Sequence, residues 1–198
     1  PTITTRGSHQ WLVAGSQRQL QLVRALVTGE TLLWPSPLSD GIAKILARRG
    51  RSTCVLASGD PFWYGIGATL ASQLDARELS CHPAPSSMSL AAARLGWPIA
   101  DVQVVSLHGR DLQLIVPHLA PERRLIVLSW DARTPGQLAA LLCQRGFGAS
   151  RMHVLELLGG PAERVRSALA LDYALPEVAD LNLVALELHG EPQALYVP

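Results

Sequence analysis

The run TCVLASGDPFWYGIG, residues 53–67, joins an apolar stretch to a turn-forming segment. Its first five residues, Thr53–Ala57, are typical of a buried strand. Gly59, Asp60 and Pro61 follow, so a glycine and a carboxylate stand at the carboxyl end of that strand. In open α/β sheets, ligands bind at this edge. We therefore expect this loop to line a ligand site, with an ordinary surface turn as the alternative interpretation.

The composition excludes several classes of partner. The chain has 198 residues, of which 48% are hydrophobic, and its formal net charge is +1. This length allows one large domain or two small ones. The near-neutral charge predicts no nucleic-acid partner. We also expect no membrane partner, because no apolar run reaches the ~18 residues of a membrane span and no leader-like segment opens the chain.

The cysteines and histidines indicate neither a disulfide framework nor a metal site. Cys54, Cys81 and Cys143 are odd in number and widely spaced. We expect them to be reduced thiols in a cytoplasmic protein. The six histidines include no pair at the spacing of helical metal ligands, so no metal site is predicted.

Helix and strand signals alternate along the chain, which is typical of α/β proteins. From residue types, spacing and turn residues we predict helices from a Ser39 cap to Gly50, at 68–74, from a Ser86 cap to Gly96, from a Thr134 cap to Gly146 and at 161–170. By the same signals we predict strands at 53–57, 101–107, 125–128, 152–156 and 182–188, with a final hairpin strand at 194–197.

These elements predict two lobes. Residues 108–121 carry turn residues and mixed polarity and are the candidate linker, so the expected lobes are residues 1–110 and 111–198. Each half alternates helices with strands, which predicts two small, mostly parallel α/β lobes with a cleft between them. The continuously apolar strand 125–128 is expected to be covered on both faces.

Four segments, read together, resemble one family: SGDPFWYGIG at 58–67, PSSMSLAAARLG at 85–96, SLHGR at 106–110 and ELLGGPAER at 156–164. In this order and spacing they resemble the tetrapyrrole methylases, which use S-adenosylmethionine. The serine-rich helix start followed by SLHGR is similar to the branch that methylates C5 of a precorrin-6-type ring in cobalamin (vitamin B12) synthesis.

The resemblance implies an S-adenosylmethionine site in the cleft between the lobes. The residues that match cofactor contacts are Ser58, Gly59, Asp60, Trp63, Ser86, Ser87, Trp130, Leu158 and Leu183. Several have ordinary structural interpretations as well, with Ser86 as a helix cap and Trp130 or Leu183 as core residues. The family also implies an acidic tetrapyrrole substrate and a homodimer.

The chemistry implied asks little of side chains, because the methyl group of the sulfonium is already activated. We expect no nucleophile, catalytic triad or metal. His108 and Arg110 are the candidate catalytic residues on the substrate side. Arg110 is expected to bind a propionate or acetate carboxylate, and His108 to donate a hydrogen bond or move a proton. An interlobe salt bridge or a capped turn is the alternative role for both.

The sequence departs from the family pattern at its start, because a first Gly-rich loop and the helix after it are absent before Trp11. We expect that the sequence omits this segment of the polypeptide. The module that methylates C15 and decarboxylates is expected to be a fused or separate partner. Two alternatives stay open: another methyl acceptor for the same fold and cofactor, or a non-catalytic corrinoid-binding module with a degraded cofactor site.

Overall fold

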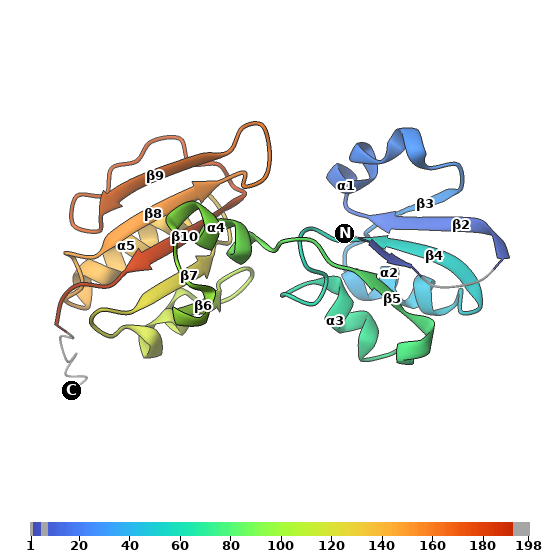
Figure 1. The fold of residues 1–198 in the computed structure, drawn as a ribbon, viewed down its shortest axis with the longest axis horizontal. Helices are drawn as coiled ribbons and strands as arrows, with labels where there is room; N and C mark the ends of the chain where they lie inside the picture. Colours follow the sequence, from blue (N-terminus) through green and yellow to red (C-terminus); the bar gives the residue numbers. More distant parts are fainter. Residues whose placement is uncertain (1, 5–7, 192–198) are drawn as a thin grey trace. The chain divides into compact units, whose positions relative to one another are not determined.

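The computed structural model describes residues 2–4 and 8–191, with backbone only for residues up to 10, and the chain forms two compact units (Figure 1). The first unit comprises residues 1–86 and the second residues 87–198. This boundary differs from the predicted one at Arg110. The reason is that β6, Val102–Ser106, pairs with β7, Arg124–Leu128, and therefore belongs to the second sheet.

The first unit contains a five-stranded sheet in the order β3-β2-β4-β1-β5. The strands are β1 Thr2–Thr4, β2 Ser8–Gly15, β3 Glu30–Leu33, β4 Arg51–Leu56 and β5 Ser80–His82. The helices are α1 Gln17–Leu22, α2 Leu38–Leu46 and α3 Ile66–Ala71, with 3-10 turns η1 Arg24–Leu26 and η2 Ala76–Glu78. β2 runs parallel to β3 and β4, whereas β1 is antiparallel to β4 and β5.

The predicted strand at 53–57 is confirmed as β4, which carries the Gly-Asp-Pro loop at its carboxyl end. Ile42 and Ile45 of α2 pack with Val55 of β4 in the core of the first unit. Ser39 does not cap this helix: α2 begins at Leu38, and Pro37 occupies the N-cap position. Proline suits the start of a helix because it has no N–H that would need a partner.

The second unit contains a five-stranded sheet in the order β6-β7-β10-β8-β9. Its further strands are β8 Arg151–Glu156, β9 Arg164–Leu169 and β10 Asn182–Glu187. Its helices are α4 Ser87–Leu95 and α5 Thr134–Gln144, with 3-10 turns η3 Ile99–Asp101 and η4 Leu112–His118. β6 and β7 are parallel, whereas β10 is antiparallel to β7 and β8, and β8 is antiparallel to β9.

The α/β class is confirmed, but the prediction of a mostly parallel sheet is wrong for the second unit. The cause lies in residues 161–170, which were predicted to be helical and instead form β9. Arg164 and Arg166 alternate with Val165 and Ser167, a period of two that fits a strand. No helix separates β8 from β9, so the two strands pair antiparallel.

The predicted linker is part of the second core. Ile115 of η4 is completely buried, and Leu112 packs against the same cluster of apolar side chains. α5 begins at Thr134 with Arg133 at the N-cap position, so Thr134 is the first helical residue rather than the cap. The predicted hairpin strand at 194–197 lies outside the described residues.

Both faces of the second sheet are covered, as predicted for strand 125–128. Leu125 and Val127 of β7 pack in a cluster with α5, whereas Ile126 packs in a second cluster with Ala91 of α4. Figure 1 shows α5 lying along the sheet formed by β7, β10 and β8. Within the described residues, no helix has both the length and the apolar character needed to cross a membrane.

A buried carboxylate stands at the carboxyl end of β8. Glu156 has no exposed surface and accepts hydrogen bonds from Arg164 Nη2 at 2.6 Å, Arg166 Nε at 2.9 Å and the Ala179 N–H at 2.8 Å. Burial raises the pKa of Glu156, but these three donors outweigh it and lower the pKa overall. The charged form therefore adds stability above the unfolded-state pKa, and this is lost as the pH falls through the folded-state pKa.

We predict that Glu156→Ala lowers the free energy of unfolding by about 3–5 kcal/mol, because two arginines and a backbone N–H lose their buried acceptor. Urea unfolding followed by circular dichroism measures this loss. Glu122→Ala is the matched control, because the exposed Glu122 carboxylate forms a hydrogen bond with the His189 imidazole, and its loss should cost less than about 1 kcal/mol. Equal losses in the two variants would contradict the prediction.

Candidate functional site

The Gly-Asp-Pro loop of the first unit is held in place by its own polar side chains. Ser58 Oγ accepts hydrogen bonds from Gln19 Nε2 at 3.1 Å and Arg18 Nη2 at 3.3 Å. Asp60 Oδ1 accepts the Phe62 N–H at 2.8 Å. The Asp60 carboxylate therefore organises the turn, which favours a structural role over that of a base.

The aromatic residues after Pro61 are exposed on a tightly folded segment. Trp63 is 37% exposed and meets Tyr64 edge-to-face with ring centroids 5.4 Å apart. Tyr64 has a φ of 49°, a left-handed conformation that is uncommon for a bulky residue. A Cβ on Gly65 would lie 2.5 Å from the Pro61 carbonyl oxygen, so only glycine fits there. The Trp63 ring is thus presented to solvent by a closely packed backbone.

Gly59 brings the loop against the start of the serine segment. Its φ is 66°, and a Cβ placed there would lie 3.1 Å from Ser86 Cα and 3.2 Å from the Pro85 carbonyl oxygen. The structure therefore brings together Ser58, Gly59, Asp60 and Ser86, which the sequence assigned to one site. Ser86 is buried, and the exposed Ser87 begins α4 directly after it.

One edge of the second sheet gathers the remaining predicted residues. β6, β7 and β8 end at this edge and β10 begins there, because β10 pairs Leu183 with Leu128 and Asn182 with Glu156. The loops that leave this edge carry the predicted residues His108, Arg110, Trp130 and Leu158. The antiparallel insertion of β10 thus adds its first residues to an edge where parallel strands end.

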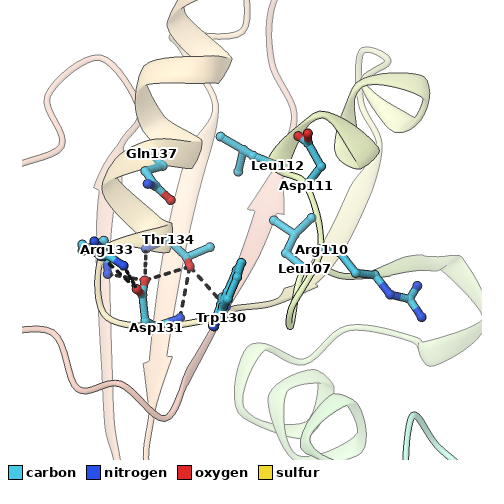
Figure 2. Close-up of a pocket in the computed structure, with 9 residues that line it drawn as sticks. All are labelled: Leu107, Arg110, Asp111, Leu112, Trp130, Asp131, Arg133, Thr134 and Gln137. Atoms are coloured by element: carbon cyan, nitrogen blue, oxygen red, sulfur yellow. Dashed lines mark hydrogen bonds and ion pairs between the residues drawn. The ribbon is translucent and has the colours of Figure 1, made fainter.

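Arg110 and Trp130 line one pocket of about 340 Å³ at this edge (Figure 2). Its walls come from the segment 107–112 and from the start of α5, with Thr134 and Gln137. Figure 2 shows the Arg110 side chain extending outward from the rim. Trp130 is 59% exposed, so it is not a core residue. His108 is exposed and lies outside the lining of this pocket.

The second arginine of the pocket is already engaged. Arg133 donates from Nε and Nη2 to Asp131 Oδ2 at 2.8 and 2.7 Å, and this pairing lowers the pKa of Asp131. Asp131 Oδ1 also accepts the N–H groups of Arg133 and Thr134, so it caps the first turn of α5. Among the described residues, Arg110 has no ion-pair partner. Of the two arginines, Arg110 is the one free to bind an anion.

Leu158 and Leu183 belong to the apolar cluster beneath α4, on the other face of the sheet from the α5 cluster. Leu183 is 2% exposed and pairs with Leu128 and Leu155, so its side chain is a core residue. Leu158 is partly buried against the same cluster. The structure thus groups these two leucines in one cluster, and neither of them lines the pocket of Arg110.

The sequence did not point to Ser129 and Asn182. In the part of the chain that the structure describes, Ser129 Oγ and Asn182 Oδ1 are buried without a hydrogen-bond partner. The Asn182 amide donates to the carbonyls of Asp131, Ala179 and Asp180 at 3.1, 2.8 and 3.3 Å, which fixes its orientation. Buried polar atoms rarely stay unpaired, so this edge retains hydrogen-bonding capacity. A polar residue at each strand end was the available signal.

Solved structures place this fold among methyltransferases. A precorrin-6Y methylase from Archaeoglobus fulgidus superposes with a TM-score of 0.64 and 27% identity, covering 91% of this chain and 85% of that one. A uroporphyrin-III C-methyltransferase from Thermus thermophilus, complexed with S-adenosylhomocysteine, shares the fold with a TM-score of 0.64 and 20% identity. The match covers 90% of this chain and 97% of that one. The family model of the tetrapyrrole (corrin/porphyrin) methylases matches residues 39–172, so the chain belongs to this family.

Three relatives of similar sequence are named as precorrin methyltransferases. A precorrin-6Y C(5,15)-methyltransferase [decarboxylating] from Sinorhizobium is 47% identical over 187 residues, which are 94% of this chain and 45% of the relative. The protein of that name from Mycobacterium tuberculosis is 38% identical over 94% of this chain and 48% of that protein. The chain thus spans about half the length of these two. A cobalt-precorrin-7 C(5)-methyltransferase from Salmonella typhimurium is 31% identical over 88% of this chain and 87% of that enzyme.

We predict that Gly59→Ala destabilises the chain more than Gly50→Ala does. Both glycines have positive φ, so each alanine costs about 1 kcal/mol of backbone strain. A Cβ at Gly50 meets nothing within 4 Å, whereas one at Gly59 lies against backbone atoms of Pro85 and Ser86. Thermal unfolding of the two variants measures the difference. Equal shifts would show that the packing of Gly59 on Ser86 is loose.

Proposed function

We propose that this chain transfers the methyl group of S-adenosylmethionine to C5 of a precorrin-type ring in cobalamin biosynthesis. The single observation that carries the proposal is the match to a C(5)-methyltransferase over 88% of this chain and 87% of that enzyme. The higher identity to precorrin-6Y C(5,15)-methyltransferases supports the same ring system.

The proposal is limited to C5. The longer relatives are named for two ring positions and for decarboxylation, and this chain aligns with about half of their length. The Salmonella enzyme is named for C5 alone, and this chain aligns with most of it. We therefore assign C15 methylation and decarboxylation to a different module, fused or separate. We also propose that the chain works as a homodimer, as the resemblance to the family implies.

The residues present fit a nucleoside cofactor that carries an amino-acid tail. In the first unit, Ser58, Gly59 and Asp60 form a partly exposed turn beside Ser86, and Trp63 presents an aromatic face. We assign the methionine part to Ser86 and Ser87. In the second unit, Trp130 and the backbone near Leu158 and Leu183 are assigned to the cofactor. The unpaired atoms Ser129 Oγ and Asn182 Oδ1 supply hydrogen-bonding capacity that an apolar ligand would leave unused.

S-adenosylmethionine supplies an electrophilic methyl group, so the protein's part is to hold the acceptor carbon in line with it. Correct placement of two reactants contributes ~7–11 kcal/mol to lowering a barrier. The carboxylates of the candidate site suit this role, since Asp60 and Asp131 each accept backbone N–H groups that shape a loop. Neither carboxylate is needed as a nucleophile.

The substrate side is assigned to Arg110 and His108. A precorrin carries several carboxylate side chains, and a guanidinium binds a carboxylate through two parallel hydrogen bonds. Arg110 has no ion-pair partner among the described residues and extends from the rim of the pocket (Figure 2). His108 stands two residues earlier on the same loop, where an imidazole can accept the proton that the ring carbon loses.

The decisive experiment is incubation of the chain with methyl-labelled S-adenosylmethionine and a precorrin-6-type substrate. The proposal predicts one labelled methyl group at C5, identified by NMR, without loss of carbon dioxide. A label at another carbon would show that the methyl acceptor is that carbon and not C5. Binding of the corrinoid without methyl transfer, and no heat on titration with S-adenosylhomocysteine, would indicate a non-catalytic carrier.

We predict that Asp60→Ala and Ser86→Ala each weaken S-adenosylhomocysteine binding by about tenfold, the effect of losing one hydrogen bond that involves a polar ligand. Isothermal titration calorimetry measures the affinity, and circular dichroism checks that the fold is kept. Wild-type affinity in both variants would show that these loops do not hold the cofactor.

We predict that Arg110→Ala raises the KM for the tetrapyrrole by about 10–100-fold, since a charge-assisted hydrogen bond contributes roughly 1.5–3 kcal/mol. The affinity for S-adenosylhomocysteine should not change. Arg133→Ala is the matched control, because Arg133 lines the same pocket but is paired with Asp131. Similar KM values for the two variants would remove Arg110 from the substrate site.

A further inference from the structure

We propose that Glu163 is a positioning residue, which holds the loop of residues 157–163 in the shape that binds the cofactor. The inference rests on the proposed function, because Leu158 of this loop is one of the assigned contacts. Glu163 itself was not among the candidate residues. It acts through the backbone of the loop and is not assigned a contact with the ligand.

The Glu163 carboxylate joins two parts of the second unit. Its Oε2 accepts the Gly159 N–H at 2.7 Å. The same carboxylate forms a two-point ion pair with Arg94, in which Arg94 Nη2 lies 3.1 Å from Oε2 and Nε donates to Oε1. Arg94 lies in the last turn of α4. One carboxylate therefore fixes the loop after β8 to the end of a helix.

The loop needs a stabilising contact of this kind because its backbone is strained. Leu157 has a φ of 53°, in the left-handed region that a leucine rarely adopts, and Gly159 has a φ of 77°. Such conformations persist only where surrounding contacts enforce them. The Leu157 N–H donates to the Leu181 carbonyl at 3.0 Å, and the Gly160 N–H to the Leu157 carbonyl at 3.1 Å. Glu163 adds the contact that fixes Gly159 between them.

α4 is the partner of this loop along much of its length. A Cβ on Gly159 would lie 3.3 Å from Leu90 Cδ1, so the loop passes close to the middle of the helix. Leu158 packs in the apolar cluster that includes Ala91. The helix starts at Ser87, an assigned contact for the methionine part. Glu163 thus connects the helix that begins with Ser87 to the loop that carries Leu158.

The charge of Glu163 favours stable contacts with Arg94 and with the Gly159 N–H. The hydrogen bond from Arg94 lowers the pKa of Glu163, and the Gly159 N–H lowers it further. Glu163 is therefore ionised at neutral pH and accepts from both donors at once. Loss of the carboxylate leaves the Gly159 N–H and the Arg94 guanidinium without this acceptor, and the strained loop is free to relax.

The test compares variants of Glu163 in the full chain by calorimetric titration with S-adenosylhomocysteine. Glu163→Ala is expected to bind about tenfold more weakly, because a charge-assisted hydrogen bond and an ion pair are lost together. Glu163→Gln keeps an amide oxygen for Gly159 and should stay within about threefold of the wild type. Wild-type affinity in Glu163→Ala would overturn the inference.

The charge-reversed double variant, Arg94→Glu with Glu163→Arg, separates the backbone contact from the ion pair. It restores opposite charges, but an arginine has no acceptor for the Gly159 N–H. We expect it to bind as weakly as Glu163→Ala. Recovery of wild-type affinity would show that the ion pair alone is sufficient, which contradicts the positioning role through Gly159.

Hydrogen exchange of residues 157–163 gives a readout that does not depend on a ligand. Exchange should be faster in Glu163→Ala than in the wild type and near normal in Glu163→Gln. Glu122→Ala, which removes an exposed hydrogen bond with His189, is the control and should change neither exchange in this loop nor affinity. Unchanged exchange in Glu163→Ala would overturn the inference.

The two proposals fail in different ways. If the wild-type chain itself binds no S-adenosylhomocysteine, the proposed function fails, and the inference fails with it. If the wild type binds and Glu163→Ala binds equally well, only the inference fails.

Discussion

The buried charge of Glu156 is the constraint on which the second unit depends. A carboxylate without exposed surface is stable only when paired and hydrogen-bonded, and here two arginines of β9 and the Ala179 N–H meet that need. Arg164 and Arg166 also donate to the carbonyls of Glu177 and Pro176. One side chain therefore fixes the pairing of β8 with β9 and the path of the connection into β10.

Carboxylates also accept backbone N–H groups at the loops of the candidate site. In each case a carboxylate accepts a backbone N–H a few residues away and sets the shape of a turn. The acceptor–donor pairs are Asp60 with Phe62, Asp111 with Gln113, Asp131 with Arg133 and Thr134, and Glu163 with Gly159. A site that holds an activated methyl donor needs defined loop geometry more than it needs acids and bases, so this use of carboxylates agrees with the proposed chemistry.

The sequence predicted the elements better than their pairing. Strand 125–128 and the Gly-Asp-Pro loop are recognisable because a continuous apolar run and a turn signal have local causes. The strand β9 was mistaken for a helix, because its alternation is carried by two arginines, Arg164 and Arg166. Their partner, Glu156, comes beside them only when β8 and β9 pair. The linker prediction failed for a related reason: the turn residues of 108–121 hide Ile115, whose burial depends on contacts with the rest of the core.

The candidate site was predictable to the extent that its residues follow strand ends. Trp130 and Arg110 lie on two separate loops, yet they share a pocket because β6 and β7 are parallel neighbours that end at one edge. Which arginine is free could not be predicted, since that depends on the two hydrogen bonds that Asp131 makes to Arg133.

Ser86 is the last residue of the first unit and Ser87 the first residue of the second. One peptide bond therefore links the assigned cofactor contacts of the first unit to those of the second. Ser86 ends the first unit and packs on Gly59, so its place is set by the loop after β4. Ser87 begins α4, whose last turn is tied by Arg94 to Glu163. A change at either end of this path therefore alters the backbone that presents the serines. The close packing of Gly59 on one side and the ion pair of Arg94 with Glu163 on the other therefore both restrict the backbone at the serine pair.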